Sequence, residues 1–96
     1  MDLLIIVSHP DAGPIVTPLA KACGQAGLNW SAFFTNDGVT TLANYDLVQA
    51  LKSAKDATVC QESWALHMSD KECPIALGSQ TTNSALVGQS DRVLSL

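Results

Sequence analysis

The sequence predicts a single small α/β domain spanning residues 1–96, in which helices flank a mostly parallel five-stranded sheet in three layers. Residues 3–7 form an apolar run of five with three β-branched members, which is typical of a strand buried on both faces of a parallel sheet. Strand-like segments then alternate with segments of helical period along the whole chain. A length of 96 residues leaves room for one thin core and little room for a second domain.

The elements follow one another in the order βαβαβαβαβ. The predicted strands are residues 3–7, 28–35, 57–61, 75–78 and 91–96. The first helix is expected to begin near Pro14, or at Pro18 with Thr17 as its cap, and to end before Gly27. The later helical segments are residues 47–54 and 62–68, and a short one that Thr82 or Asn83 caps. Such alternation implies right-handed crossovers and helices on both faces of the sheet.

The amino-acid composition excludes several classes of function. Apolar residues make up 47% of the chain and charged residues 15%, against about 25% in an average domain. This shortage of charge favours an oligomer, although a monomer with a Ser/Thr/Asn-rich surface is the alternative. The net charge of −4, without any basic cluster, argues against direct nucleic-acid binding and against an anionic membrane surface. The N-terminus lacks a basic region and no apolar run reaches about 18 residues, so we expect a cytoplasmic protein without a membrane segment.

Three cysteines, Cys23, Cys60 and Cys73, are too few and too scattered for a disulfide framework. No C-x-x-C pair occurs, and His9 and His67 form no metal motif with the cysteines, so we expect neither a metal nor a cofactor. Helical spacing places Cys23 in the core. The sequence therefore leaves the other two thiols as candidates for chemistry.

Ligands of open α/β sheets bind beyond the carboxyl ends of the strands. That rule selects the loops at residues 8–13, 36–39 and 60–64, which supply His9, Asp11, Asp37 and Cys60. In the common strand order 2-1-3-4-5, His9 and Cys60 would leave neighbouring strands at one edge. A nearby cation and the start of a helix would both favour the Cys60 thiolate, the nucleophilic form.

Each candidate also has a structural interpretation. Cys60 fits a small buried residue at the end of a strand, which is the usual place of a free cysteine. His9 fits an exposed loop residue, and Asp37 and Gly38 fit a turn. Trp64 fits a packing or interface aromatic.

Three stretches, residues 31–39, 58–65 and 90–96, resemble the DsrE/DsrF/DsrH superfamily, which includes the TusB, TusC and TusD proteins of tRNA thiolation. They correspond to an aromatic strand followed by Asp-Gly-Val, a cysteine at a strand end with the helix after it, and the terminal strand. The resemblance implies a DsrE-like five-stranded α/β fold with flavodoxin-like layering, trimers or hexamers, and sulfur relay through a persulfide. Cys60 matches the persulfide cysteine of the DsrE and TusD type. The length is closer to the DsrH and TusB type, and Glu62 and Ser63 stand where the family often has small residues.

These observations favour an intracellular sulfur-relay protein that carries sulfane sulfur on Cys60, in the manner of a sulfurtransferase, with His9 or helix amides stabilising the thiolate. Its partners would be sulfur donor and acceptor proteins, in a homo-oligomer or in a hetero-oligomer with DsrE-family paralogues. Two alternatives are a non-catalytic scaffold subunit of such an oligomer and a small-ligand-binding domain. The residues expected to contact substrate or partner are Asp37, Gly38, Glu62, Ser63 and Trp64.

Overall fold

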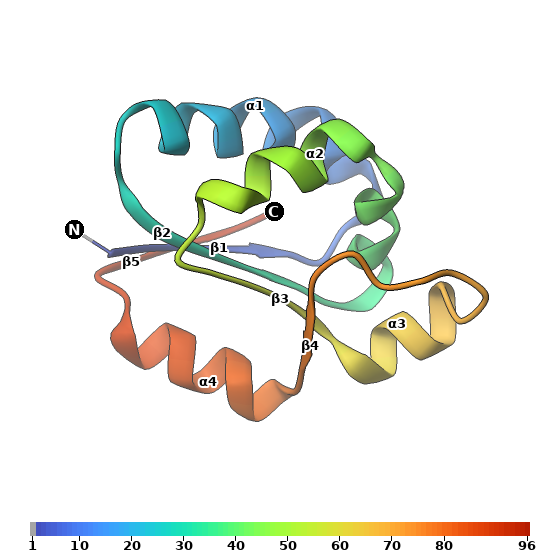
Figure 1. Ribbon diagram of the computed structural model, residues 1–96. Helices are drawn as coiled ribbons and strands as arrows, with labels where there is room; N and C mark the ends of the chain where they lie inside the picture. Colours follow the sequence, from blue (N-terminus) through green and yellow to red (C-terminus); the bar gives the residue numbers. More distant parts are fainter. Residues whose placement is uncertain (1) are drawn as a thin grey trace.

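A computed structural model describes residues 2–96, and strands and helices alternate in it from end to end (Figure 1). The strands are β1 (Asp2–Val7), β2 (Asn29–Phe34), β3 (Asp56–Cys60), β4 (Ala76–Gly78) and β5 (Arg92–Ser95). The α-helices are α1 (Gly13–Gln25), α2 (Tyr45–Ala50), α3 (Gln61–His67) and α4 (Gln80–Gln89). Three short 3-10 helices accompany them: η1 (Pro10–Ala12), η2 (Asn36–Ala43) and η3 (Leu51–Ser53). The predicted α/β alternation is confirmed.

All five strands are parallel and lie in the order β4-β3-β2-β1-β5. The expected order 2-1-3-4-5 is therefore wrong: β2 lies between β1 and β3. In register, Val7 pairs with Phe34, Phe34 with Val59, and Cys60 with Gly78. The carboxyl ends of β2, β3 and β4 consequently meet at one edge of the sheet.

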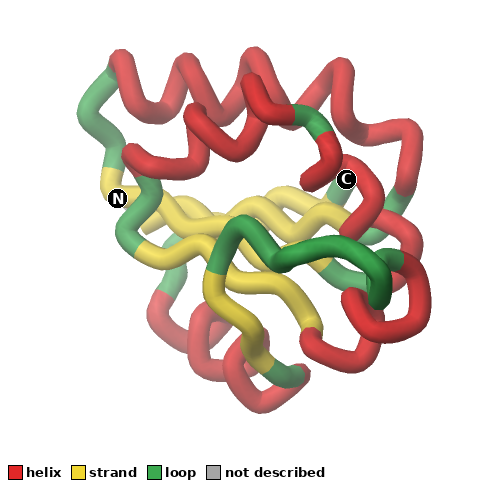
Figure 2. The backbone as a smooth tube through the Cα atoms, turned by 45° about the vertical axis from the view of Figure 1, so that its right-hand side comes forward, coloured by secondary structure: helices red, strands yellow, loops and turns green. Residues whose placement is uncertain are grey.

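Crossover handedness distributes the helices over the two faces. The chain steps sideways in one direction from β1 to β2 to β3, so right-handed connections place α1 and α2 on the same face. The connection from β4 to β5 runs back across the sheet, and α4 covers the opposite face (Figures 1 and 2). Helix α3 lies beyond the carboxyl ends of the strands, where Trp64 and Met68 join the core of the α1/α2 face. The predicted three-layer architecture is thus present.

The two faces bury very different amounts of apolar surface. The α1/α2 face holds the main core, in which Trp30 and Phe34 of β2 pack with Val16 of α1 and Leu47 of α2. The α4 face holds a small cluster of four buried residues, namely Leu4, Phe33, Cys60 and Leu86. Leu86 is the one buried residue of α4, so a single side chain anchors this helix to the sheet.

Local signals fix the helix ends. Helix α1 starts at Gly13 with Pro14 in its first turn, so the alternative start at Pro18 is wrong and Pro18 lies inside the helix. Gly27 follows α1 with φ +66, the left-handed conformation expected after a helix end. Helix α4 starts at Gln80 and its cap is Ser79, which forms a capping box with Thr82, so the expected cap at Thr82 or Asn83 is wrong by three or four residues.

The buried hydroxyl of Thr17 in α1 lowers the free energy of unfolding. Its Oγ1 is buried without a hydrogen-bond partner among the described residues, and the side chain is 8% exposed. Valine has nearly the same shape without the hydroxyl, so Thr17→Val should raise the free energy of unfolding by about 1 kcal/mol. Urea denaturation followed by circular dichroism measures this change. A lower midpoint in Thr17→Val would show that the hydroxyl is satisfied, for example by a buried water.

Candidate functional site

A pocket opens between the carboxyl ends of β3 and β4. The chain leaves β3 into α3, which packs with the α1/α2 core, and leaves β4 into α4 on the other face. Neighbouring strands whose connections diverge in this way form a topological switch point, where open α/β sheets bind ligands. The pocket has a volume of about 420 Å³, within the range of small-ligand sites. Its lining residues are Cys60, Gln61, Glu62, Gly78, Ser79, Gln80 and Thr81.

Cys60 is the last residue of β3 and lies at the base of this pocket. Its side chain points to the α4 face, where 5% of the residue is exposed. Burial acts to raise the pKa of the thiol, but hydrogen bonds outweigh burial and hold the pKa below its usual range. They come from the side chain and backbone of Ser63, the side chain of Gln80 and the backbone of Glu62. The site therefore favours the thiolate of Cys60.

Ser63 connects Cys60 to the loop after β2. Its Oγ accepts a hydrogen bond of 2.9 Å from the backbone N–H of Asn36, which adopts a left-handed conformation with φ 52. A hydroxyl that accepts from an N–H keeps its own proton free to donate. The loop after β2 thereby orients the Ser63 hydroxyl as a donor towards the thiolate.

Gln80, which the sequence interpretation missed, comes from the first turn of α4. Its Nε2 lies 3.2 Å from Thr35 Oγ1 and 3.7 Å from Cys60 Sγ. An amide NH₂ carries two donors, so Gln80 serves both partners at once. The signal was present in the sequence, because Gln80 follows the fourth strand just as Cys60 ends the third. The rule for the carboxyl ends of strands also selects the loop after the fourth strand, which contains Gln80.

His9 lies away from this pocket. Its Nδ1 accepts a hydrogen bond of 3.3 Å from the N–H of Asp11, and the imidazole lines a separate hollow with Ala12, Ile15 and Leu96. Its expected position next to Cys60 depended on β1 and β3 being neighbours, and β2 separates them. The hydrogen bonds that support the Cys60 thiolate come from other residues.

Asp37 and Gly38 lie in the first turn of η2, the 3-10 segment after β2. Asp37 Oδ1 lies 3.1 Å from Nε2 of His67, and this contact ties η2 to the last turn of α3. Gly38 packs directly on the β1 backbone at Val7, which explains why a glycine is needed. Both residues hold the loop in place and neither lines the Cys60 pocket.

Trp64 points away from the pocket, although it lies in the same helix as Ser63. It is 7% exposed within the α1/α2 core, and its Nε1 donates a hydrogen bond of 3.2 Å to the Lys71 carbonyl oxygen. Trp64 thus packs α3 and anchors the chain that leads to β4, which matches its structural interpretation.

The other two thiols occupy different environments. Cys23 is 2% exposed in the α1/α2 core, as predicted, and burial raises its pKa. Cys73 is half-buried before β4, and its Sγ lies 3.1 Å from the Ile75 carbonyl oxygen. All three cysteines are free thiols, and residues 2–96 contain no group of three side chains arranged to hold a metal ion.

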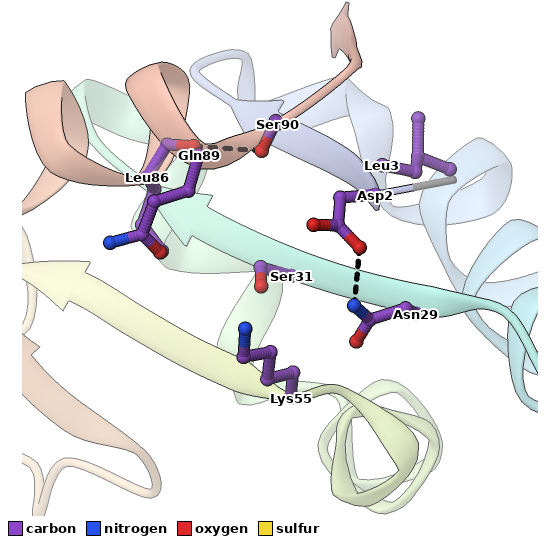
Figure 3. Close-up of a pocket in the computed structure, with 8 residues that line it drawn as sticks. All are labelled: Asp2, Leu3, Asn29, Ser31, Lys55, Leu86, Gln89 and Ser90. Atoms are coloured by element: carbon purple, nitrogen blue, oxygen red, sulfur yellow. Dashed lines mark hydrogen bonds between the residues drawn. The ribbon is translucent and has the colours of Figure 1, made fainter.

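A second hollow lies at the opposite, amino-terminal edge of the sheet (Figure 3). Figure 3 shows the Asn29 amide directed to the Asp2 carboxylate, and Ser90 Oγ donates a bond of 2.7 Å to the Leu86 carbonyl oxygen. The volume of this amino-terminal hollow, about 10 Å³, suffices for roughly one water molecule. This hollow is therefore too small for a ligand larger than water.

Within residues 2–96, none of the helices has the length and apolar character needed to cross a bilayer. Neither a protein-family model nor a curated protein sequence matches this chain significantly.

Proposed function

We propose that this protein carries sulfane sulfur as a persulfide on Cys60. The main support is the environment of the Cys60 thiol. It lines a pocket at the switch point of the sheet, and its hydrogen bonds favour the thiolate. The resemblance to the DsrE/DsrF/DsrH superfamily supports the same residue and the same chemistry. Glu62 and Ser63 contribute through their backbone groups and the Ser63 hydroxyl, while Gln80 replaces His9 as the side chain that assists Cys60.

The transfer conserves electrons. The Cys60 thiolate attacks the outer sulfur of a donor persulfide, R–S–SH, and forms a new S–S bond as the donor S–S bond breaks. The products are Cys60–S–SH and the donor thiolate R–S⁻, so no external oxidant or reductant is needed. An acceptor thiolate removes the outer sulfur by the same exchange and restores Cys60.

The proposal extends to assembly and location. Large apolar side chains lie on the surface, among them Leu66 at 77% and Tyr45 at 75% exposed. Together with the low charge content, they support an oligomer, either of identical chains or with paralogues. Persulfide exchange between proteins requires reduced thiols, which supports a cytoplasmic setting.

The pocket volume also supports the alternative of small-ligand binding at the same place. The two functions make different use of the thiol. A bound ligand held by Gln80, Ser79 and the helix amides would still bind to a Cys60→Ser chain, whereas sulfur transfer would stop.

The deciding experiment is intact-mass analysis after incubation with a freshly prepared persulfide donor. The wild type should gain one sulfur atom that reductant removes, and Cys60→Ser should gain none at this position. Cys73→Ser is the matched control and should load like the wild type, since Cys73 lies outside the pocket. A folded wild-type protein that gains no sulfur, or that gains it equally in Cys60→Ser, would refute the proposal.

A further inference from the structure

We infer that the Cys60 pocket discriminates among donors by charge, accepting sulfur from neutral or positively charged donors and disfavouring anionic ones. This inference rests on the proposed function and adds the class of substrate. It follows from the charges around the pocket and from how the helix amides are used.

Glu62 is the one charged side chain besides the thiolate among the described residues that line the pocket. It is exposed in the first turn of α3, two residues after Cys60. None of the five basic residues lines the pocket. Lys21 pairs with Asp46 between α1 and α2, Lys55 lines the amino-terminal hollow, and Lys71 lines a groove beside Trp64.

Two helices begin at this pocket, α3 with Gln61 and α4 with Gln80. Each N-terminus carries at most about half a positive charge, so together they offset roughly one negative charge. In sum the thiolate balances this positive charge, and the backbone groups of Glu62 and Ser63 at the start of α3 bond to it. The Glu62 carboxylate then remains uncompensated, and an arriving anion meets a net charge of about −1.

The effect of one such charge is modest but measurable. A single carboxylate about 8 Å away in water changes the local concentration of a monovalent reagent about twofold, upwards for cations and downwards for anions. The ratio of the two rates should therefore be about fivefold at low salt. It should approach one at 1 M salt, where the Debye length is about 3 Å.

Charge-matched methanethiosulfonates provide the test. The Cys60 thiolate displaces methanesulfinate from the trimethylammonium-ethyl reagent or from the sulfonato-ethyl reagent and forms a mixed disulfide. Rates at Cys60 are read by peptide mass mapping and divided by those of a neutral small thiol, so that intrinsic reactivity cancels. In the wild type we expect the cationic reagent to react with Cys60 about five times faster than the anionic one after this normalisation. In Glu62→Gln this lead of the cationic reagent should vanish. Glu72→Gln, in the groove beside Trp64, is the matched control and should keep the lead.

Sulfur loading is measured in parallel with the persulfides of cysteamine, which is cationic, and glutathione, which is anionic. Faster loading from the cysteamine persulfide, lost in Glu62→Gln, supports the inference. Equal rates for the two thiosulfonates, or a lead of the anionic one, overturn it even if sulfur is carried. A cationic lead without loading from either persulfide overturns the proposed function and not the charge preference.

Discussion

Replacing Gly38 by alanine is expected to lower the free energy of unfolding by about 3 kcal/mol, a large part of the stability of a domain this small. A Cβ atom on Gly38 would lie 2.7 Å from the carbonyl carbon of Val7 and 2.9 Å from Cα of Ser8, and closer still to the Val7 carbonyl oxygen. These are backbone atoms, and the same oxygen accepts the N–H of Thr35 at 2.9 Å. The end of β1 therefore cannot move away without breaking its pairing with the chain after β2.

Gly88→Ala is the matched control for this substitution. Gly88 lies in α4 and a Cβ there meets nothing within 4 Å, so alanine should raise stability by about 0.5–1 kcal/mol through helix propensity. Denaturation in urea, compared at equal slope, measures both variants. If Gly38→Ala unfolded at the wild-type midpoint but lost sulfur loading, Gly38 would be a contact residue of the site, as first expected, and not a packing residue.

Sequence periodicity predicted the alternation of elements because the cause is local. The run from Leu3 to Val7 is apolar at every position, and in the structure both of its faces are covered. The lateral order of strands has no such local cause. Whether β3 joins β1 or β2 depends on contacts between residues far apart in the sequence, such as Val16 of α1 and Leu47 of α2, which share one core in the structure. The wrong order followed from a common topology and not from any residue of this chain.

In the candidate site, too, the residues that are close in sequence could be predicted and those that are distant in sequence could not. Cys60, Glu62 and Ser63 are neighbours in sequence, so one strand end and one helix start were enough to predict that they act together. Gln80 reaches Cys60 from 20 residues away through the pairing of β3 with β4. The fourth strand has only three residues, and its neighbour α4 begins at a capping box earlier than the expected cap. His9 was linked to Cys60 through the wrong strand order.

Removing the two side-chain donors to Cys60 together should slow its alkylation about tenfold at neutral pH. Each hydrogen bond to a charged group contributes roughly 1.5 kcal/mol, so Ser63→Ala with Gln80→Ala should lower the thiolate fraction by up to about a hundredfold, the full factor applying at pH values below the folded pKa. A more basic thiolate is also a better nucleophile, so each remaining thiolate reacts about ten times faster and the net loss of alkylation rate is about tenfold. The pH profile of iodoacetamide labelling, read at Cys60 by peptide mapping, should move to higher pH. Ser63→Ala alone should move it further than Gln80→Ala alone, since Ser63 is the stronger cause of the lowered pKa.

Ser84→Ala and Gln89→Ala, both at exposed positions of α4, are the matched controls and should leave the profile unchanged. Stability supplies an independent check on the sign. A pKa lowered by folding means that the Cys60 thiolate adds stability above the pKa of the unfolded thiol, about 8.5, and that this part is lost as pH falls through the folded pKa. The double variant should lose that pH-dependent part. A variant that stays folded with an unchanged labelling profile would show that Ser63 and Gln80 pack beside the sulfur without stabilising its charge, and Cys60 would then be a buried strand-end residue of the α4 face.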